Sequence, residues 1–426
     1  MTELSIDETI LLEKLFEPSK LFFMLNTSKR VNKLIASPIR KFLPMVRAAE
    51  KKGVKFFKLN VGDPDIFAPK EILRGIKGYN NRNIPYAPSP GISEHVRAWL
   101  KYYALFGIKL KEENIVPTVG GAEGILLALM AVADVGEEII VFEPLYPSYK
   151  GFAAVCNVKL VPITLKLENN FKLPAIQEIA KKINKKTRAL VIINPDNPTG
   201  KVWSNQELKN IIQLARKNNL FIIADETYRE IIFKGKPKSI LNFSGARNNT
   251  LVIDSLSKRF SAPGIRIGAL VSYHQKIMRA ILKMAMIRLS APTVEQLATV
   301  AILKNSKKYT SKIANEYKHR RDAVNDALKK IPGVLVSEPA GAFYQVAKLP
   351  VKNAEDFIKF LIADFRYKNK TVLVAPLEDF YVSHGLGRNE IRVAYVLNVK
   401  ELREAMEIFK KGLEQYLKNS KKKSLG

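Results

Sequence analysis

The chain has 426 residues, of which 47% are hydrophobic and 26% are charged, and these values exclude wholesale disorder. Its apolar runs fall well short of the roughly 20 residues that a membrane-spanning helix needs, so we expect no membrane segment. The 70 Lys and Arg against 40 Asp and Glu give a formal charge of +30. Because the lysines are spread along the chain, we expect a solvated basic surface and no specific nucleic acid partner.

Residues 1–26 form a mixed polar and apolar N-terminal extension, in which the run LLEKLF predicts a short helix. The extension lacks the basic start, apolar stretch and cleavage site that a signal peptide needs. The single cysteine, Cys156, excludes an internal disulfide. We therefore expect a cytoplasmic protein.

The middle of the chain alternates strand-like and helical patterns. Short apolar runs that predict strands cover residues 139–142, 188–193, 220–224 and 251–253. Between two of them, residues 204–218 have a helical period, with Ser204 and Glu207 in the spacing of an N-terminal capping box. This alternation predicts an α/β domain whose central sheet is mostly parallel and flanked by helices.

The last third of the chain predicts a second domain. A helical pattern without Gly or Pro runs from about 300 to 330 and ends before Pro332 and Gly333. Beyond it we expect strands at 333–337, 342–346, 372–375 and 391–395, and helices at 354–369 and 400–417. The basic tail, residues 419–426, is expected to be frayed.

Polar motifs follow the predicted strands: NPDNPTG at 194–200, ADETY at 224–228 and DSLSKRFSAPGIRIG at 254–268. Ligands bind at the carboxyl ends of parallel strands, where these motifs lie. Neighbouring arginines lower the pKa of Lys258 and make its amine nucleophilic, and hydroxyls with an arginine suit a phosphate. A reactive lysine, an acid at a strand tip (Asp225) and a phosphate cup together indicate a pyridoxal 5′-phosphate site.

The three motifs occur in the order and spacing of the class I and II aminotransferases, and the chain resembles this family from about Ser28 to Leu417. The resemblance implies a fold type I architecture, with a large domain and a smaller α+β domain. It implies a large pyridoxal phosphate-binding domain at 63–310 and a discontinuous small domain at 27–62 and 311–426, after the extension at 1–26. It implies pyridoxal 5′-phosphate and no metal ion.

The resemblance also assigns roles around the cofactor ring. Lys258 is similar to the lysine that links covalently to the cofactor and later moves the substrate proton. Asp225 resembles the acid that keeps the ring nitrogen protonated. Tyr228 and Asn197 resemble the pair that binds the ring oxygen, and Tyr146 resembles the aromatic residue stacked on the ring. Thr227 is expected to cover the other ring face.

For the phosphate, the resemblance implies Ser255, Arg266 and the backbone of Gly121, Ala122 and Glu123 at the start of an apolar helix. The family often has a hydroxyl or amide side chain at the position of Ala122, so one contact is expected to be missing. Tyr86 resembles the tyrosine that the partner subunit contributes to the phosphate, which implies a homodimer with shared active sites.

For the substrate, Arg392 resembles the arginine that binds the α-carboxylate, and Asn197 and Gly62 resemble residues beside it. Phe343 and Tyr344 are expected to line the side-chain pocket. Arg288 lies near the position where other members place an arginine, from the partner subunit, for a distal carboxylate.

The implied activity is ping-pong transamination between an L-amino acid and a 2-oxo acid, with 2-oxoglutarate as the expected acceptor. Aspartate, alanine and aromatic amino acids remain open as donors. A pyridoxal phosphate-dependent carbon–sulfur lyase or synthase on the same fold is the alternative, since it would share every cofactor residue. A DNA-binding regulator would need a winged-helix domain, for which residues 1–26 are too short.

Overall fold

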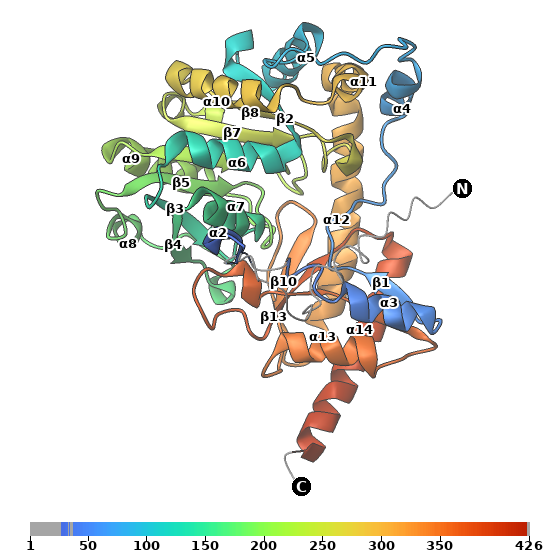
Figure 1. Cartoon of the computed structure of the whole chain (residues 1–426). Coiled ribbons are helices and arrows are strands. Elements are labelled where there is room, and N and C mark those ends of the chain that lie inside the picture. Colours follow the sequence, from blue (N-terminus) through green and yellow to red (C-terminus); the bar gives the residue numbers. More distant parts are fainter. Residues whose placement is uncertain (1–26, 33, 35–36, 424–426) are drawn as a thin grey trace.

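The computed structural model describes residues 27–32, 34 and 37–423 (Figure 1). A seven-stranded sheet is its centre, with the strand order β2-β8-β7-β6-β5-β3-β4. Its strands are β2 (Ile115–Val119), β3 (Glu138–Glu143), β4 (Lys159–Thr164), β5 (Thr187–Ile193), β6 (Phe221–Asp225), β7 (Thr250–Ser255) and β8 (Ile267–Val271). Only β8 runs antiparallel to its neighbours in this sheet. The predicted α/β architecture with a mostly parallel sheet is therefore confirmed.

Helices cover both faces of this sheet because consecutive strand residues point to opposite sides. Ile139 and Ile223 pack on one face with α6 (Gly120–Val132), α7 (Ser148–Cys156) and α10 (Gln275–Arg288). Ile140 and Ile222 pack on the other face. The helices of that second layer are α5 (Ser93–Ala104), α8 (Ile176–Ala180), α9 (Asn205–Lys217) and α11 (Thr293–Lys304), and α4 (Lys70–Lys77) packs on α11. Burial on both faces explains why the strands are almost uniformly apolar.

The predicted capping box at the start of α9 is confirmed. The side chain of Ser204 accepts a hydrogen bond from the backbone N–H of Glu207, and the Glu207 carboxylate accepts one from the N–H of Ser204. The predicted continuous helix over 300–330 is wrong, because α11 ends at Lys304 and α12 (Lys307–Lys329) starts anew. Asn305 donates from its side chain to the carbonyl of Ala301, 3.1 Å away, and so ends the helix locally.

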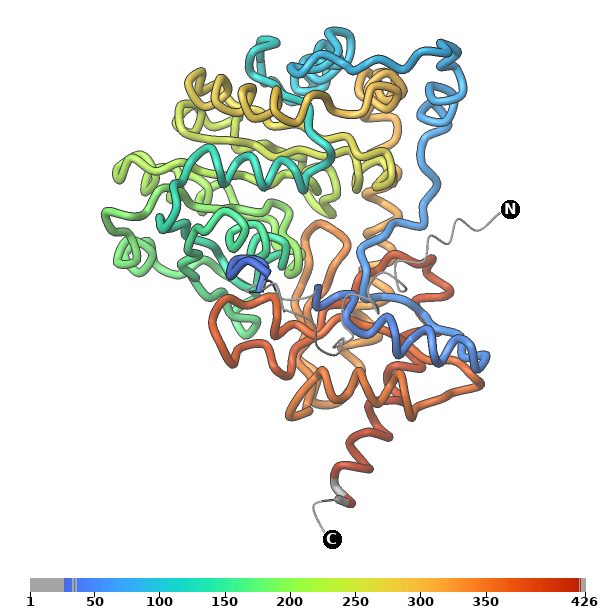
Figure 2. Tube along the Cα trace, viewed as in Figure 1, coloured from blue at the N-terminus to red at the C-terminus, as the bar shows by residue number. Residues whose placement is uncertain are grey.

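The second part of the molecule contains two smaller sheets and lies below the large sheet in Figure 1. A four-stranded antiparallel sheet consists of β9 (Leu335–Val336), β10 (Tyr344–Lys348), β12 (Ala375–Pro376) and β13 (Glu390–Ala394). A separate parallel pair joins β1 (Lys55–Lys58) to β11 (Lys370–Leu373). The two strands of this pair are distant in sequence. Figure 2 shows the blue tube of β1 among orange and red elements.

The helices of this part are α3 (Leu43–Lys51), α12, α13 (Ala354–Ala363) and α14 (Val399–Lys423), and a short helix α2 (Lys29–Asn32) contacts α7. The prediction of a helix to residue 369 is wrong, because the Arg366 guanidinium donates to the carbonyls of Leu361 and Ile362 and caps α13 early. The prediction that the tail frays from residue 419 is wrong as far as Lys423, because α14 continues to that residue. The predicted helix LLEKLF lies outside the described residues.

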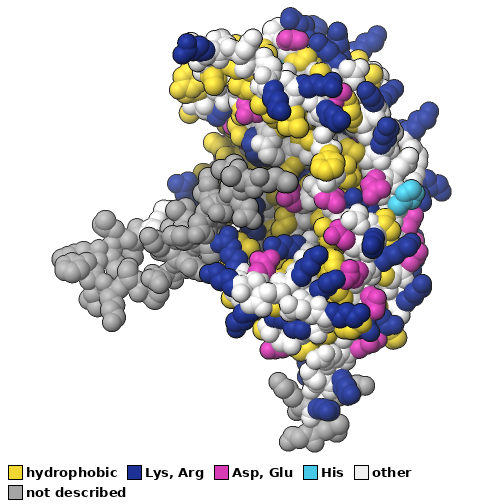
Figure 3. All heavy atoms as spheres, turned by 90° about the vertical axis from the view of Figure 1, so that its right-hand side faces the viewer, with side chains coloured by type: hydrophobic (Ala, Val, Ile, Leu, Met, Phe, Trp, Pro, Cys, Tyr) yellow, Lys and Arg dark blue, Asp and Glu magenta, His cyan; other side chains and the backbone are white. Residues whose placement is uncertain are grey.

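The part of the chain that the structure describes also has six short 3-10 helices: Glu112–Asn114, Leu167–Asn169, Ile240–Asn242, Ser244–Ala246, Pro263–Ile265 and Glu378–Phe380. Across residues 27–32, 34 and 37–423, no helix is both long and apolar enough to cross a bilayer. Figure 3 shows lysine and arginine side chains scattered over one face, interspersed with fewer acidic ones. On this face the excess positive charge is distributed rather than gathered in one patch.

Candidate active site

A cavity of about 780 Å³ lies at the carboxyl ends of the central strands. Asp225 ends β6 and Ser255 ends β7, while Tyr344 of β10 and Arg392 of β13 reach it from the second sheet. Residues that are far apart in the sequence therefore line a single cavity between the two parts of the molecule.

Lys258 lines this cavity and is partly buried. Its Nζ donates a hydrogen bond to the carbonyl oxygen of Gly62, 2.8 Å away, and lies 5.9 Å from the ring centre of Phe343. Burial lowers the pKa of the Lys258 ammonium to about 8; Asp63 opposes this effect, and the nearby cations Arg392 and Arg266 add to it. A much larger fraction of this amine is neutral near pH 7 than is usual for lysine, as a nucleophile requires.

Gly62 makes this approach possible. A Cβ atom at this position would collide with the hydroxyl of Tyr344 and press on the ring of Phe343. Only glycine lets the backbone come this close to both aromatic rings and to the lysine amine.

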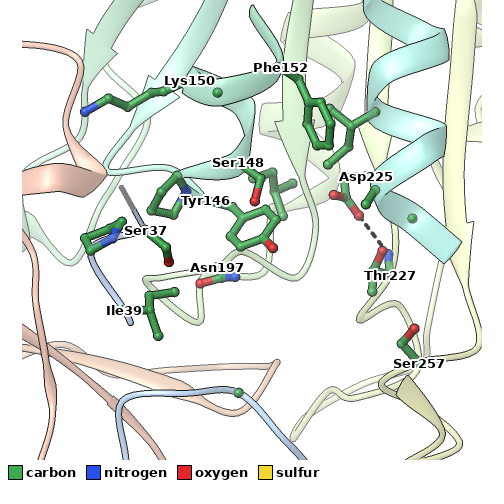
Figure 4. Close-up of a pocket in the computed structure, with 18 of the residues that line it drawn as sticks. Ser37, Ile39, Tyr146, Ser148, Lys150, Phe152, Asn197, Asp225, Thr227 and Ser257 are labelled. Atoms are coloured by element: carbon green, nitrogen blue, oxygen red, sulfur yellow. Dashed lines mark hydrogen bonds between the residues drawn. The ribbon is translucent and has the colours of Figure 1, made fainter. Parts of the chain in front are cut away.

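Asp225 also lines the cavity, with its carboxylate held by two hydrogen bonds. Its Oδ1 accepts a hydrogen bond from the backbone N–H of Thr227 (3.1 Å), and its Oδ2 accepts one from the hydroxyl of Tyr149 (3.2 Å). Figure 4 shows Tyr146, Asn197, Asp225 and Thr227 converging on the cavity. Burial raises the pKa of the Asp225 carboxyl, while these hydrogen bonds oppose that rise.

An anion cradle lies beside Lys258. Helix α6 begins at Gly120, so the free N–H groups of its first turn face the cavity at Gly121 and Ala122. Arg266 crosses this turn, with its Nη2 donating to the carbonyl of Val119 at 3.2 Å. The hydroxyl of Ser255 donates to the hydroxyl of Ser257, 2.9 Å away. Backbone N–H groups, a guanidinium and hydroxyls suit a phosphate dianion.

Two further contacts link the parts of the molecule across the cavity. The hydroxyls of Tyr228 and Tyr344 are hydrogen-bonded at 2.9 Å. Buried Arg392 donates from Nη1 to Oδ1 of Asn197 at 2.9 Å and from Nη2 to the carbonyl of Asn60 at 2.5 Å. Its Nε has no hydrogen-bond partner among the described residues. A buried unpaired donor beside an open cavity is suited to an incoming carboxylate.

These groups fit pyridoxal 5′-phosphate. An acid for a ring nitrogen, an amine for an aldehyde and an anion cradle for a phosphate line one cavity. The fit concerns the chemistry of the donors: the buried Lys258 amine, the Asp225 carboxylate and the free N–H groups of α6.

Four predicted site residues do not line the cavity within one chain. Phe343 is fully buried and does not line it, although its ring centre lies 5.9 Å from the Lys258 Nζ. The Tyr86 side chain is 78% exposed. Glu123 forms an ion pair with Arg288, with 3.2 Å between Oε2 and Nη1, and its carboxylate also accepts from the N–H of Val119. Arg288 also donates to the carbonyl of Pro117. In this chain, Arg288 is therefore neutralised by Glu123 rather than directed into its own cavity.

Sequence reasoning missed several residues of the site. Tyr149, in the first turn of α7, does not line the cavity but donates from its buried hydroxyl to the Asp225 carboxylate. Ser37 and Ile39 of the N-terminal segment do line the cavity. Nothing in their local sequence indicates this, because the contact depends on the hydrogen bond from the Asn60 side chain to the carbonyl of Ile39.

The comparisons with known proteins agree with this geometry. The family model for aminotransferase class I and II matches residues 54–409. The aspartate aminotransferase of Pyrococcus horikoshii is 33% identical over 394 residues, which are 91% of this chain and 97% of that protein. The (5-formylfuran-3-yl)methyl phosphate transaminase of Methanocaldococcus jannaschii is 29% identical over 91% of this chain and its own full length.

Solved structures are similarly close. Aspartate aminotransferase from Thermus thermophilus with maleate superposes with a TM-score of 0.83 at 25% identity, covering 91% of this chain and 100% of that one. Alanine aminotransferase from Pyrococcus furiosus gives a TM-score of 0.83 at 28% identity over 92% and 100%. These matches are to aminotransferases and give the lyase alternative no support. The chain is an aminotransferase of the class I and II family, with the fold type I architecture.

Proposed function

We propose that the cavity binds pyridoxal 5′-phosphate and that the enzyme uses it to move an amino group from an L-amino acid to a 2-oxo acid, with 2-oxoglutarate as the acceptor. The observation that carries this proposal is the convergence of Lys258, Asp225 and Arg392 on one cavity. They supply an amine, an acid and a carboxylate-binding cation.

The cofactor, when bound, joins to an amino group and withdraws electrons from the carbon next to it. Lys258 first supplies the amine that holds the cofactor and then takes the proton from the substrate carbon, for which a pKa of about 8 is well matched to neutral pH. Asp225 holds a proton on the ring nitrogen. Tyr228 and Asn197 bind the ring oxygen, and Tyr146 and Thr227 cover the two ring faces.

The phosphate is proposed to sit in the anion cradle of Gly121, Ala122, Ser255 and Arg266, with the N–H of Glu123 close by. Alanine at position 122 contributes its backbone N–H and no side-chain hydroxyl.

The substrate α-carboxylate is proposed to bind Arg392 and Asn197 near Gly62. Their existing hydrogen bond aligns the guanidinium before substrate arrives. Similarity to aspartate and alanine aminotransferases supports one of these amino acids as donor, and an aromatic donor remains the third candidate. Phe343 packs behind Lys258, while Tyr344 lines the cavity directly.

We also propose a homodimer in which Tyr86 reaches the partner's phosphate. Exposed apolar side chains lie in the same segment, at Ile84, and in a second segment, at Ile287 and Leu289. The segments are adjacent because Ser89 donates to the carbonyl of Leu289 at 2.6 Å. The large domain is proposed to span 63–310 and the small domain 27–62 with 311–426. A single cysteine suits the cytoplasm.

The visible absorbance spectrum tests the function. Purified protein with pyridoxal 5′-phosphate should show the band of the lysine-linked cofactor, and adding glutamate, aspartate or alanine singly should convert it to the band of the aminated cofactor. Conversion by one of them identifies a donor. A band that none of these or the aromatic amino acids changes would contradict transamination, and no band at all would contradict cofactor binding.

A further inference from the structure

A cluster of buried charges lies behind the cavity. We define the buried charge cluster as Glu226, Arg229, Glu230, Asp254 and Arg259, together with the hydroxyls of Tyr102 and Tyr103 from α5. Its five charged side chains are at most 3% exposed. Burying charges is costly, so this number of them beside an active site calls for an explanation.

Members of the buried charge cluster are chain neighbours of site residues. The neighbouring pairs are Asp225 and Glu226, Tyr228 and Arg229, Ser255 and Asp254, and Lys258 and Arg259. Within each pair, the site residue lines the cavity and its neighbour belongs to the cluster. The cluster is therefore built on the same backbone segments that carry the cofactor-binding side chains.

Arg259 binds the backbone of the turn that carries Lys258. Its Nη2 donates to the carbonyl oxygen of Ser255 at 3.0 Å and pairs with Oδ1 of Asp254. The same Oδ1 accepts a hydrogen bond from the backbone N–H of Ser255 at 2.7 Å. On its other side, Nη1 donates to the hydroxyl of Tyr102. One guanidinium thus fixes the two ends of the turn relative to each other and to α5.

Arg229 has the same charge and burial but different partners. It donates to side chains: to the carboxylate of Glu226 at 2.5 Å, to Oδ2 of Asp254 at 2.7 Å and to the hydroxyl of Tyr102 at 2.7 Å. It therefore contacts the Ser255–Lys258 turn only through the Asp254 carboxylate and, among the described residues, makes no hydrogen bond to the backbone of that turn. The chain itself thus supplies a matched control for Arg259.

We propose that Arg259, anchored by Asp254, is a positioning residue that holds the Ser255–Lys258 turn so that the Lys258 amine stays buried and directed into the cavity. This inference rests on the proposed role of Lys258. A planar guanidinium bridges a carboxylate and a carbonyl at once, which a single ammonium cannot do in the same geometry. Small displacements of a reacting group cost about 10²-fold in rate.

The test compares Arg259→Lys with Arg229→Lys. Both keep one buried positive charge, and both are expected to lower the melting temperature. Only Arg259→Lys should lower kcat of the transamination half-reaction, by about 10- to 100-fold, with little change in KM, because Arg392 and Asn197 lie on other segments. Arg259→Gln, which still donates to a carbonyl but carries no charge, is the second variant if the first does not fold.

A second readout needs no cofactor. The pH dependence of Lys258 acylation, followed by peptide mass mapping, reports the pKa of its amine in the cofactor-free protein. Asp63, Arg266 and Arg392 face this amine and are unchanged in both variants. We expect an apparent pKa near 8 in the wild type and in Arg229→Lys, and a value moved toward the ordinary 10.5 in Arg259→Lys as the turn loosens and water reaches the amine.

Equal losses of kcat in the two variants, or an unchanged Lys258 pKa in Arg259→Lys, would overturn the positioning role. Failure of the wild-type protein to aminate its cofactor would instead contradict the proposed function. The two failures are therefore distinguishable.

Discussion

Arg392 donates a hydrogen bond from Nη1 to Oδ1 of Asn197, with 2.9 Å between the atoms, although the two residues come from different parts of the molecule. Arg392 lies in β13, and Asn197 follows β5 of the central sheet. The guanidinium is also stacked 4.3 Å from the ring centre of Tyr344. Its orientation is thus determined jointly by both parts of the molecule, before any substrate is bound.

Replacing Arg392 with Lys should raise KM for the amino acid donor by about 10- to 100-fold, because a charge-assisted hydrogen bond contributes about 1.5–3 kcal/mol. The ammonium keeps the charge but loses the planar pair of donors. Steady-state kinetics measure the change, and the cofactor absorbance band serves as control because it should persist. A KM equal to that of the wild type would remove Arg392 from the carboxylate site.

Replacing Asp225 with Asn should lower kcat by about 10²–10³-fold, since the ring nitrogen loses its buried anion. The cofactor should still bind, because Lys258 and the anion cradle are unaffected. Tyr149→Phe is a milder variant, because it removes only one hydrogen bond to the carboxylate. It is expected to lower kcat by about 10-fold or less. Single-turnover absorbance measurements give both rates. If Tyr149→Phe were as slow as Asp225→Asn, the assignment of the anion would need revision.

The buried Lys258 makes the stability of the cofactor-free protein depend on pH. Its pKa is about 8 when folded, against 10.5 for an ordinary lysine, so the unfolded chain binds the proton more tightly between these values. The buried charge therefore lowers the free energy of unfolding by its full amount below pH 8. This loss of stability disappears as the pH rises toward 10.5. Lys258→Met should be more stable than the wild type at pH 7 by up to about 3 kcal/mol.

Urea unfolding of both proteins at pH 7 and at pH 10.5 measures this difference, which should shrink at the higher pH. Lys418→Met, at an exposed position of α14, is the control and should show no such change. A difference that stays constant with pH would contradict the lowered pKa of Lys258.

Arg288→Leu tests whether the partner subunit contributes a side chain for dicarboxylate substrates. If it does, KM for aspartate should rise about 10-fold or more while KM for alanine changes little. Glu123→Gln is the companion variant, because it frees Arg288 from its ion pair. Equal effects of Arg288→Leu on both substrates would reduce the role of Arg288 to holding Glu123.

Local patterns predicted the strands and the capping of α9 because these features depend on neighbours in sequence. The helix over 300–330 was mispredicted because one side chain, Asn305, bonds to the backbone and divides it. The early end of α13 depends on Arg366 folding back on its own helix. Neither interaction changes the apolar period, and so neither was visible in the sequence pattern.

The family resemblance implied that Lys258, Asp225 and Arg392 lie at one site, and all three line the same cavity. The buried charge cluster was not foreseen, although Arg229 and Arg259 stand next to site residues. Charged residues in a sequence are usually solvated, and only the packing of α5 against the strand ends reveals that these are enclosed.

The hairpin of β7 and β8 carries Ser255, Ser257, Lys258 and Arg266, so the lysine proposed to link to the cofactor and two of the side chains proposed to bind its phosphate are encoded in one continuous stretch of sequence. Arg392, in contrast, comes from a different sheet. Binding of the substrate α-carboxylate by Arg392 is thus structurally separate from the lysine hairpin: exchanging segments of the second sheet between related enzymes should alter substrate affinity while the hairpin is inherited unchanged.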